Sequence, residues 1–240
     1  MHVGSQPHHP PPPPPPPPPA VTPAPAATPV APHVLPSPKP IGRLHGSPIL
    51  HRPTGPAPAP GVTPPPNGLP SDIPASMVVT GPSIFGNNAF DPAAWKGTLY
   101  EIPTGAQKLP ALATIAPKGY LFDSKLDIAS QAMTGGFPGI DPARNTDFAI
   151  RFEAPLVVGT EADYTFGILS DDGSQVFIDD TLIVDDDGSH GATLKTGPVH
   201  LVVGTHALRV DYFQGTGQVA LRLLCDKGAT ATDVCPTKLP

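Results

Sequence analysis

From Asp147 onward, short apolar runs alternate with polar residues and are separated by Gly, Asp and Pro. Such runs predict β-strands, because successive side chains of a strand point to opposite faces of the sheet. Strands are expected at 98–102, 148–152, 164–168, 176–178, 182–184, 199–203, 206–213 and 219–223. Their spacing of about 8 to 15 residues, with turn residues between them, is typical of an all-β antiparallel sandwich or barrel.

Proline divides the chain into two parts. Of its 39 prolines, 28 precede Ala75, including the unbroken run Pro10 to Pro19. Such a segment lacks large apolar side chains and cannot bury enough surface to offset the entropy of ordering. We therefore expect a disordered proline-rich stalk or linker over residues 1–75 and one folded domain over residues 76–240. A ligand for a proline-recognising partner is the alternative role of the tail.

The predicted domain is acidic. The net charge of the chain is −6, of which the first 74 residues contribute +2, so the remainder carries −8. Without a cluster of Lys and Arg, a nucleic-acid partner is not expected, since phosphate backbones are bound by basic groups.

Two cysteines, Cys225 and Cys235, lie near the C-terminus on either side of a polar loop. This spacing suits one disulfide in an oxidising compartment, and two reduced thiols in a cytosolic protein are the alternative. No apolar stretch approaches the roughly 20 residues that span a bilayer. The first residues lack the charged and apolar regions of a signal peptide, so either an export signal lies outside this sequence or the protein is not exported by that route.

Seven aspartates lie between Asp171 and Asp187, with no Lys or Arg among them. Their repulsion requires a compensating cation or hydrogen-bond donors. Asp-rich oxygen sites suit calcium, although hairpin turns also favour Asp. The turn explains Asp179 and Asp180, between two apolar runs, whereas for Asp171 and Asp172 both interpretations stay open. The spacing is not that of an EF-hand.

Several motifs in order resemble the PA-fourteen (PA14) module, a domain of the protective-antigen toxin component, fibro-slime proteins, glycosidases and microbial adhesins. These motifs are Gly167 to Asp179, Leu182 to Asp185, Asp187 to His190, Leu201 to His206 and Arg209 to Gly215. The resemblance extends from about Thr98 to Leu224. It implies an antiparallel two-sheet β-sandwich whose adhesin members bind sugars through a calcium ion.

In those adhesins, two successive aspartates joined by a cis peptide hold the ion, and a second loop supplies an amide side chain and backbone carbonyls. The resemblance therefore implies Asp171 and Asp172 as metal ligands. The second loop would contribute Gln214, where the family often has Asn, and Thr216, with Gly215 and Gly217 as further carbonyl donors beside the ligand.

The loop Asp187-Gly188-Ser189-His190 is the candidate wall of the ligand site. His190 could donate to a sugar hydroxyl or cap its own loop. His200 and His206 lie in or beside strands, which favours structural roles. Trp95, the single tryptophan, could stack on a sugar, but a packing role is favoured.

These features bear on three classes of function. We expect a calcium-dependent carbohydrate-binding module that holds a glycan or cell-surface polysaccharide, secreted or displayed at the cell surface or in the periplasm. The alternative is a structural module that docks other domains of a surface assembly and binds no sugar. An enzyme is not expected, because the sequence has no recognisable nucleophile elbow, zinc-protease motif or phosphate loop.

Overall fold

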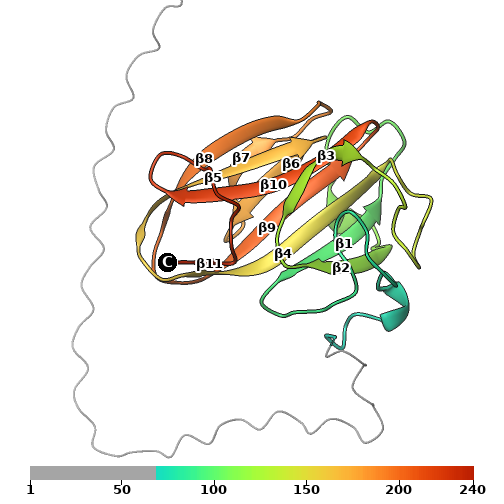
Figure 1. The fold of residues 1–240 in the computed structure, drawn as a ribbon, viewed down its shortest axis with the longest axis horizontal. Coiled ribbons are helices and arrows are strands. Elements are labelled where there is room, and N and C mark those ends of the chain that lie inside the picture. Colours follow the sequence, from blue (N-terminus) through green and yellow to red (C-terminus); the bar gives the residue numbers. More distant parts are fainter. Residues whose placement is uncertain (1–68) are drawn as a thin grey trace, which may run out of the picture. The chain divides into compact units, whose positions relative to one another are not determined.

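The computed structural model describes residues 69–240, so the proline-rich segment before Leu69 lies outside the described residues (Figure 1). The described part forms the 3-10 helices η1 (Ala75–Met77) and η2 (Leu112–Thr114) and the strands β1 (Trp95–Glu101), β2 (Gly119–Asp123), β3 (Asp127–Ala132), β4 (Phe148–Val158), β5 (Ala162–Asp171), β6 (Ser174–Ile178), β7 (Thr181–Asp186), β8 (Thr193–Leu201), β9 (Gly204–Gln214), β10 (Gln218–Lys227) and β11 (Lys238–Leu239).

The strands form two layers, as Figure 1 shows. A seven-stranded sheet has the order β2-β1-β4-β9-β6-β7, with β11 parallel to β4, and a four-stranded sheet has the order β3-β10-β5-β8. All other pairings between the named strands are antiparallel. The predicted antiparallel two-sheet β-sandwich is therefore confirmed.

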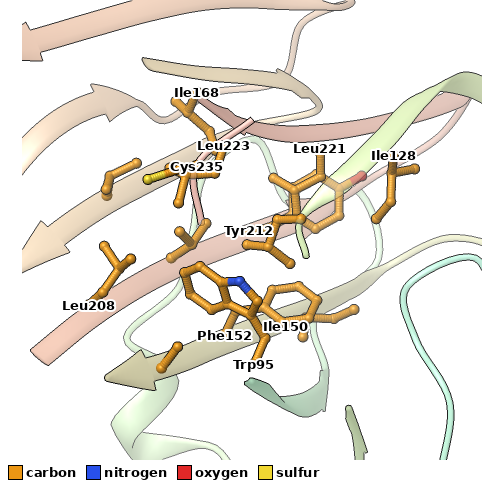
Figure 2. Packing of buried hydrophobic residues seen from close by; sticks show 14 of the residues in the cluster. Trp95, Ile128, Ile150, Phe152, Ile168, Leu208, Tyr212, Leu221, Leu223 and Cys235 are labelled. Carbon is orange, nitrogen blue, oxygen red and sulfur yellow. The ribbon is translucent and has the colours of Figure 1, made fainter. Parts of the chain in front are cut away.

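The core lies between the two sheets and follows from the alternation of the strands (Figure 2). In the central pair β4 and β9, Ile150 lies opposite Tyr212 and Phe152 opposite Val210, and all four side chains are fully buried. Trp95 is 1% exposed and packs edge-on against Phe152, with ring centroids 6.4 Å apart. Trp95 therefore has the packing role.

Two regions differ from the pattern expected from the sequence. The expected strand at 199–203 belongs to β8, which already begins at Thr193 and ends at Leu201, and Val202 and Val203 form the turn into β9. These valines are 50% and 62% exposed, so their apolar character does not reflect burial. Strands β2 and β3 were not expected, and β3 carries a single buried residue, Ile128, which gives no alternating signal.

The packed part of the chain includes residues before the predicted start at residue 76. Leu69 and Ile73 are buried in a small cluster with Val78 and Phe122. At the other end of the chain, Cys225 and Cys235 form a disulfide with Cα atoms 4.8 Å apart, which ties the C-terminal segment to β10. Among the described residues, none of the helices has the length and apolar character of a membrane span.

Candidate calcium and ligand site

Asp171 and Asp172 stand where the chain passes from one sheet to the other. Asp171 ends β5 in the four-stranded sheet, and β6 begins two residues after Asp172 in the seven-stranded sheet. The peptide bond between the two aspartates is cis. Both residues are largely buried, at 9% and 3% exposure. This arrangement holds two carboxylates at one end of the sandwich, where β7 and β9 also end.

Asp172 joins two of the loops that the sequence assigned to the site. Its Oδ1 accepts hydrogen bonds from Ser189 Oγ at 2.9 Å and from the backbone N–H of His190 at 3.1 Å. Its Oδ2 accepts a hydrogen bond from the N–H of Gly215 at 2.8 Å. The 187–190 loop and the 215–217 loop therefore both converge on Asp172.

Asp171 has no such set of donors around its carboxylate. Burial, followed by the charge of Asp172, raises the pKa of Asp171, although the charge of His190 and the Ala192 N–H act in the opposite direction. Within residues 69–240, the ion pairs include neither Asp171 nor Asp172. The two carboxylates thus repel each other, with the charge of His190 as a partial offset, and a bound cation would relieve the rest.

Gln214 lies beneath the site rather than in its opening. Its side chain is fully buried, Nε2 donates to the Gln218 carbonyl at 3.0 Å, and Oε1 lies 2.5 Å from the Tyr212 hydroxyl. That hydroxyl also lies 2.6 Å from the Asp171 carbonyl, and its single proton can serve one of these two oxygens at a time. In this arrangement the second loop contacts Asp172 through the Gly215 N–H and not through the Gln214 amide.

The remaining positions of the second loop differ in exposure. Gly215 is buried and its carbonyl accepts a hydrogen bond from the Asp147 N–H at 3.3 Å. Thr216 and Gly217 are exposed. Carboxylate oxygens and backbone carbonyls are the ligands that calcium prefers. Among the described residues, no three His, Cys, Asp or Glu side chains come together as a metal cluster, so any ion here would depend on backbone and amide oxygens.

His190 is held inside its own loop. Its Nε2 lies 2.9 Å from the Asp186 carbonyl and its Nδ1 lies 2.9 Å from the Gly191 carbonyl. Burial lowers the pKa of His190, but these hydrogen bonds and the charges of Asp186 and Asp172 outweigh burial and raise it. Both ring nitrogens therefore lie against the loop backbone, as expected for the capping role.

Asp187 and Gly188 have positioning contacts. Asp187 Oδ1 accepts a hydrogen bond from the backbone N–H of Leu109 at 2.8 Å, which attaches the β1–β2 connection to the site. Gly188 has φ of 140° and lies against Gly173. A Cβ added to Gly173 would come within 2.5 Å of the Gly188 nitrogen. Glycine at 173 thus allows the 187–190 loop to approach the aspartate pair closely.

The β1–β2 connection also forms a wall of the site, which the sequence did not indicate. Asp147 Oδ1 accepts a hydrogen bond from the Gly105 N–H at 3.0 Å, and Ala106 and Leu109 pack on a small cluster that contains Phe213. Gly173, directly after the aspartate pair, was a visible signal for close packing. Asp147 and the 103–111 segment had no local signal, because their contacts are distant in sequence.

The other candidate residues lie elsewhere. Asp179 and Asp180 form the β6–β7 turn with φ of 49° and 61°, and they pair with His206 and Arg209. His200 pairs with Asp163 and Glu161 on the surface. These residues therefore have the structural roles that the sequence favoured.

The fold and this loop site define a two-sheet β-sandwich with an acidic pair at one end. The model of the PA14 domain family matches residues 96–235, which is more than half of the chain. The chain belongs to the PA14 domain family.

Solved structures with the same architecture have low sequence identity to this chain. The PA14 domain of the MpAFP antifreeze protein is 15% identical, with a TM-score of 0.51, and the match covers 60% of this chain and 88% of that one. The PA14 sugar-binding domain from an RTX adhesin is 17% identical (TM-score 0.49; 61% and 97% covered). An anti-sigma factor domain-containing protein is 17% identical (TM-score 0.48; 60% of this chain), and the match spans 46% of its length. No curated protein matches the chain significantly.

Proposed function

We propose that this chain is a calcium-dependent carbohydrate-binding module of the adhesion type, working outside the cell. The observation that carries the proposal is the aspartate pair at 171–172, whose buried carboxylates lie side by side without an ion-pair partner among residues 69–240. Calcium offsets this repulsion and keeps open coordination positions that two neighbouring hydroxyls of a sugar can fill. Membership of the PA14 family supports the sugar half of the proposal.

The surrounding loops supply the walls of this site. Ser189 and the 215–217 loop flank Asp172, and the β1–β2 connection, held by Asp187, adds a further side. Calcium coordination by Gln214 would require its amide oxygen to share or leave the Tyr212 hydroxyl. The carboxylates and the exposed carbonyls at 216 and 217 are therefore the first ligands to test.

The decisive experiment compares thermal unfolding with millimolar calcium and with chelator. Binding at 100 times Kd stabilises the fold by about 2.7 kcal/mol, which raises Tm by about 5 to 10 °C for a domain of this size. The variant Asp171→Asn keeps the side-chain shape and removes one charge, so it should lose this response. The matched control Asp180→Asn, in the exposed pair, should keep it. An identical melting curve with calcium and chelator in the native protein refutes the calcium site.

The sugar half needs a separate measurement. A glycan array probed with the native protein should give signals in calcium that vanish in chelator and in Asp171→Asn. The calcium response and the array are measured independently. A rise in Tm with calcium and no signal on the array would therefore support the metal site and refute glycan binding.

A second candidate function is a structural module of a surface assembly. It is favoured by the hydrogen bonds around Asp172, whose three protein donors already join two loops without an ion. Under this alternative, calcium leaves Tm unchanged, the array is blank and a partner protein co-purifies with the chain.

A further inference from the structure

A groove of about 690 Å³ lies on the outer face of the seven-stranded sheet. It is lined by the beginning of β9 (Thr205 to Arg209), by Glu153 to Pro155 of β4 and by the segment before β1. From Ala207 to Gln214, β9 advances by seven residue steps, about 23 Å at the rise of an antiparallel strand. The groove is therefore separate from the aspartate pair at 171–172.

The floor of the groove is apolar because two short side chains lie opposite each other. Pro155 of β4 and Ala207 of β9 are cross-strand neighbours, and the next outward pair toward the centre of the sheet is Glu153 and Arg209. Ala207 is exposed and Pro155 is half-buried, so the sheet surface is open to solvent between taller neighbours. Phe90, partly buried against Phe122, lines the groove from outside the sheet.

The rim carries two ion pairs and one further carboxylate, that of Asp91. Lys96 Nζ lies 2.9 Å from Glu153, and Arg209 Nη1 lies 3.1 Å from Asp180. The Arg209 guanidinium is also fixed over the Phe177 ring, 4.0 Å from its centroid. These pairs provide hydrogen-bond donors and acceptors on both sides of an apolar floor without a strong net charge.

This combination favours one class of ligand. A highly charged ligand meets a rim whose charges are paired except for Asp91, so electrostatic attraction is weak. Strand addition of a peptide at Pro155 is disfavoured, because one edge of β4 is paired there with β9 and proline has no N–H to donate on the other edge. A neutral sugar ring has an apolar C–H face for the floor and hydroxyls that both donate and accept at the rim.

We propose that this groove, with Pro155 and Ala207 as its floor, is a second binding site that takes neutral hydroxylated ligands such as short oligosaccharides, independently of calcium. The volume lies within the range of about 300 to 1,000 Å³ that is usual for small-molecule sites. The site would give the domain two separate contacts with an extended polysaccharide, and such pairs of weak sites strengthen overall binding.

The test is a titration of the full chain with cellotriose, maltotriose and mannotriose in chelator, followed by two-dimensional amide NMR. At least one probe should shift the amides of residues 205–209 in a saturable way. The variant Ala207→Trp fills the groove from an exposed position and should weaken this binding at least tenfold. Ala207→Ser is the matched control and should bind as the native protein does.

The outcomes separate this proposal from the calcium site. Asp171→Asn should leave the groove titration unchanged, even where it abolishes the calcium response. If Ala207→Trp fails to fold, Thr205→Trp blocks the same groove from another exposed position of β9. The proposal is overturned if none of the three probes shifts residues 205–209, if the shifts persist in the filled variant, or if a proline-rich peptide binds there in place of the sugars.

Discussion

Two aspartate pairs lie at opposite ends of the same short strand, β6, and they differ in burial and in their partners. Asp171 and Asp172 precede the strand, are largely buried and take part in no ion pair among the described residues. Asp179 and Asp180 follow it in an exposed turn, where His206 contacts the first and Arg209 the second. The second pair is satisfied by neighbouring cationic groups, whereas the first pair is held by the Ser189 hydroxyl and by backbone N–H groups.

The comparison shows that local acidity does not identify a metal site by itself. Both pairs contribute to the same run of seven aspartates, and both accept hydrogen bonds from distant backbone groups. What differs is the surrounding charge and burial. Burial and the neighbouring carboxylate raise the pKa of Asp171, while the hydrogen bonds from His206 and the Ala207 N–H lower the pKa of Asp179.

The largest expected effect follows from adding a methyl group beside the first pair. In Gly173→Ala, the Cβ would come within 2.5 Å of the Gly188 nitrogen and 2.6 Å of the Gly188 oxygen. Because backbone cannot move aside easily, we expect a loss of about 2 to 3 kcal/mol in the free energy of unfolding. Urea denaturation measures this loss.

Gly191→Ala is the matched control, because its added Cβ meets nothing within 4 Å. It should change stability by less than about 0.5 kcal/mol. Equal stability of the two variants would show that the 187–190 loop does not pack tightly against the aspartate pair.

The second pair should give a pH-dependent effect of intermediate size. His206 Nδ1 lies 2.6 Å from Asp179 Oδ2, and this bond, with the Val202 carbonyl, raises the pKa of His206 although burial opposes the shift. A raised histidine pKa stabilises the folded state fully below the unfolded value of about 6.5. That stabilisation is lost as pH rises through the folded pKa.

His206→Gln removes the titrating group and should cost about 1 to 2 kcal/mol at pH 6. The difference between native protein and variant should shrink at pH 9, as measured by urea denaturation at both pH values. Below the ordinary pKa of Asp179, the contribution should also fall, since that carboxylate has a lowered pKa and becomes protonated. A difference that is constant with pH would contradict the ion pair.

The sequence was sufficient for the strands with regular alternation, and it led to the aspartate pair as a candidate metal site, which stays a prediction. It was insufficient where the deciding contact is distant: Leu109 and Asp187 are 78 residues apart, and Gly105 and Asp147 are 42 apart. The ligand role of Gln214 was implied by the family resemblance and stays a prediction; its buried amide oxygen lies against the Tyr212 hydroxyl. Side-chain direction at the end of a strand depends on the packed neighbours and not on the residue type alone.

The smallest expected effect concerns the hydrogen bonds that Asp187 and Asp179 accept from backbone N–H groups distant in the sequence. Asp187 Oδ1 accepts from Leu109 N–H, and Asp179 Oδ1 accepts from Ala207 N–H, both at 2.8 Å. In Asp187→Ala the first bond is lost, so stability should fall by about 0.5 to 1 kcal/mol. Amide exchange should become faster at Leu109 and stay unchanged at Ala207.

Asp187→Asn retains an acceptor oxygen and should preserve much of the protection at Leu109. If Asp187→Ala leaves the exchange at Leu109 unchanged, the apolar cluster around Phe213 holds the 103–111 segment by itself, and the wall beside the first pair does not depend on the acidic loop.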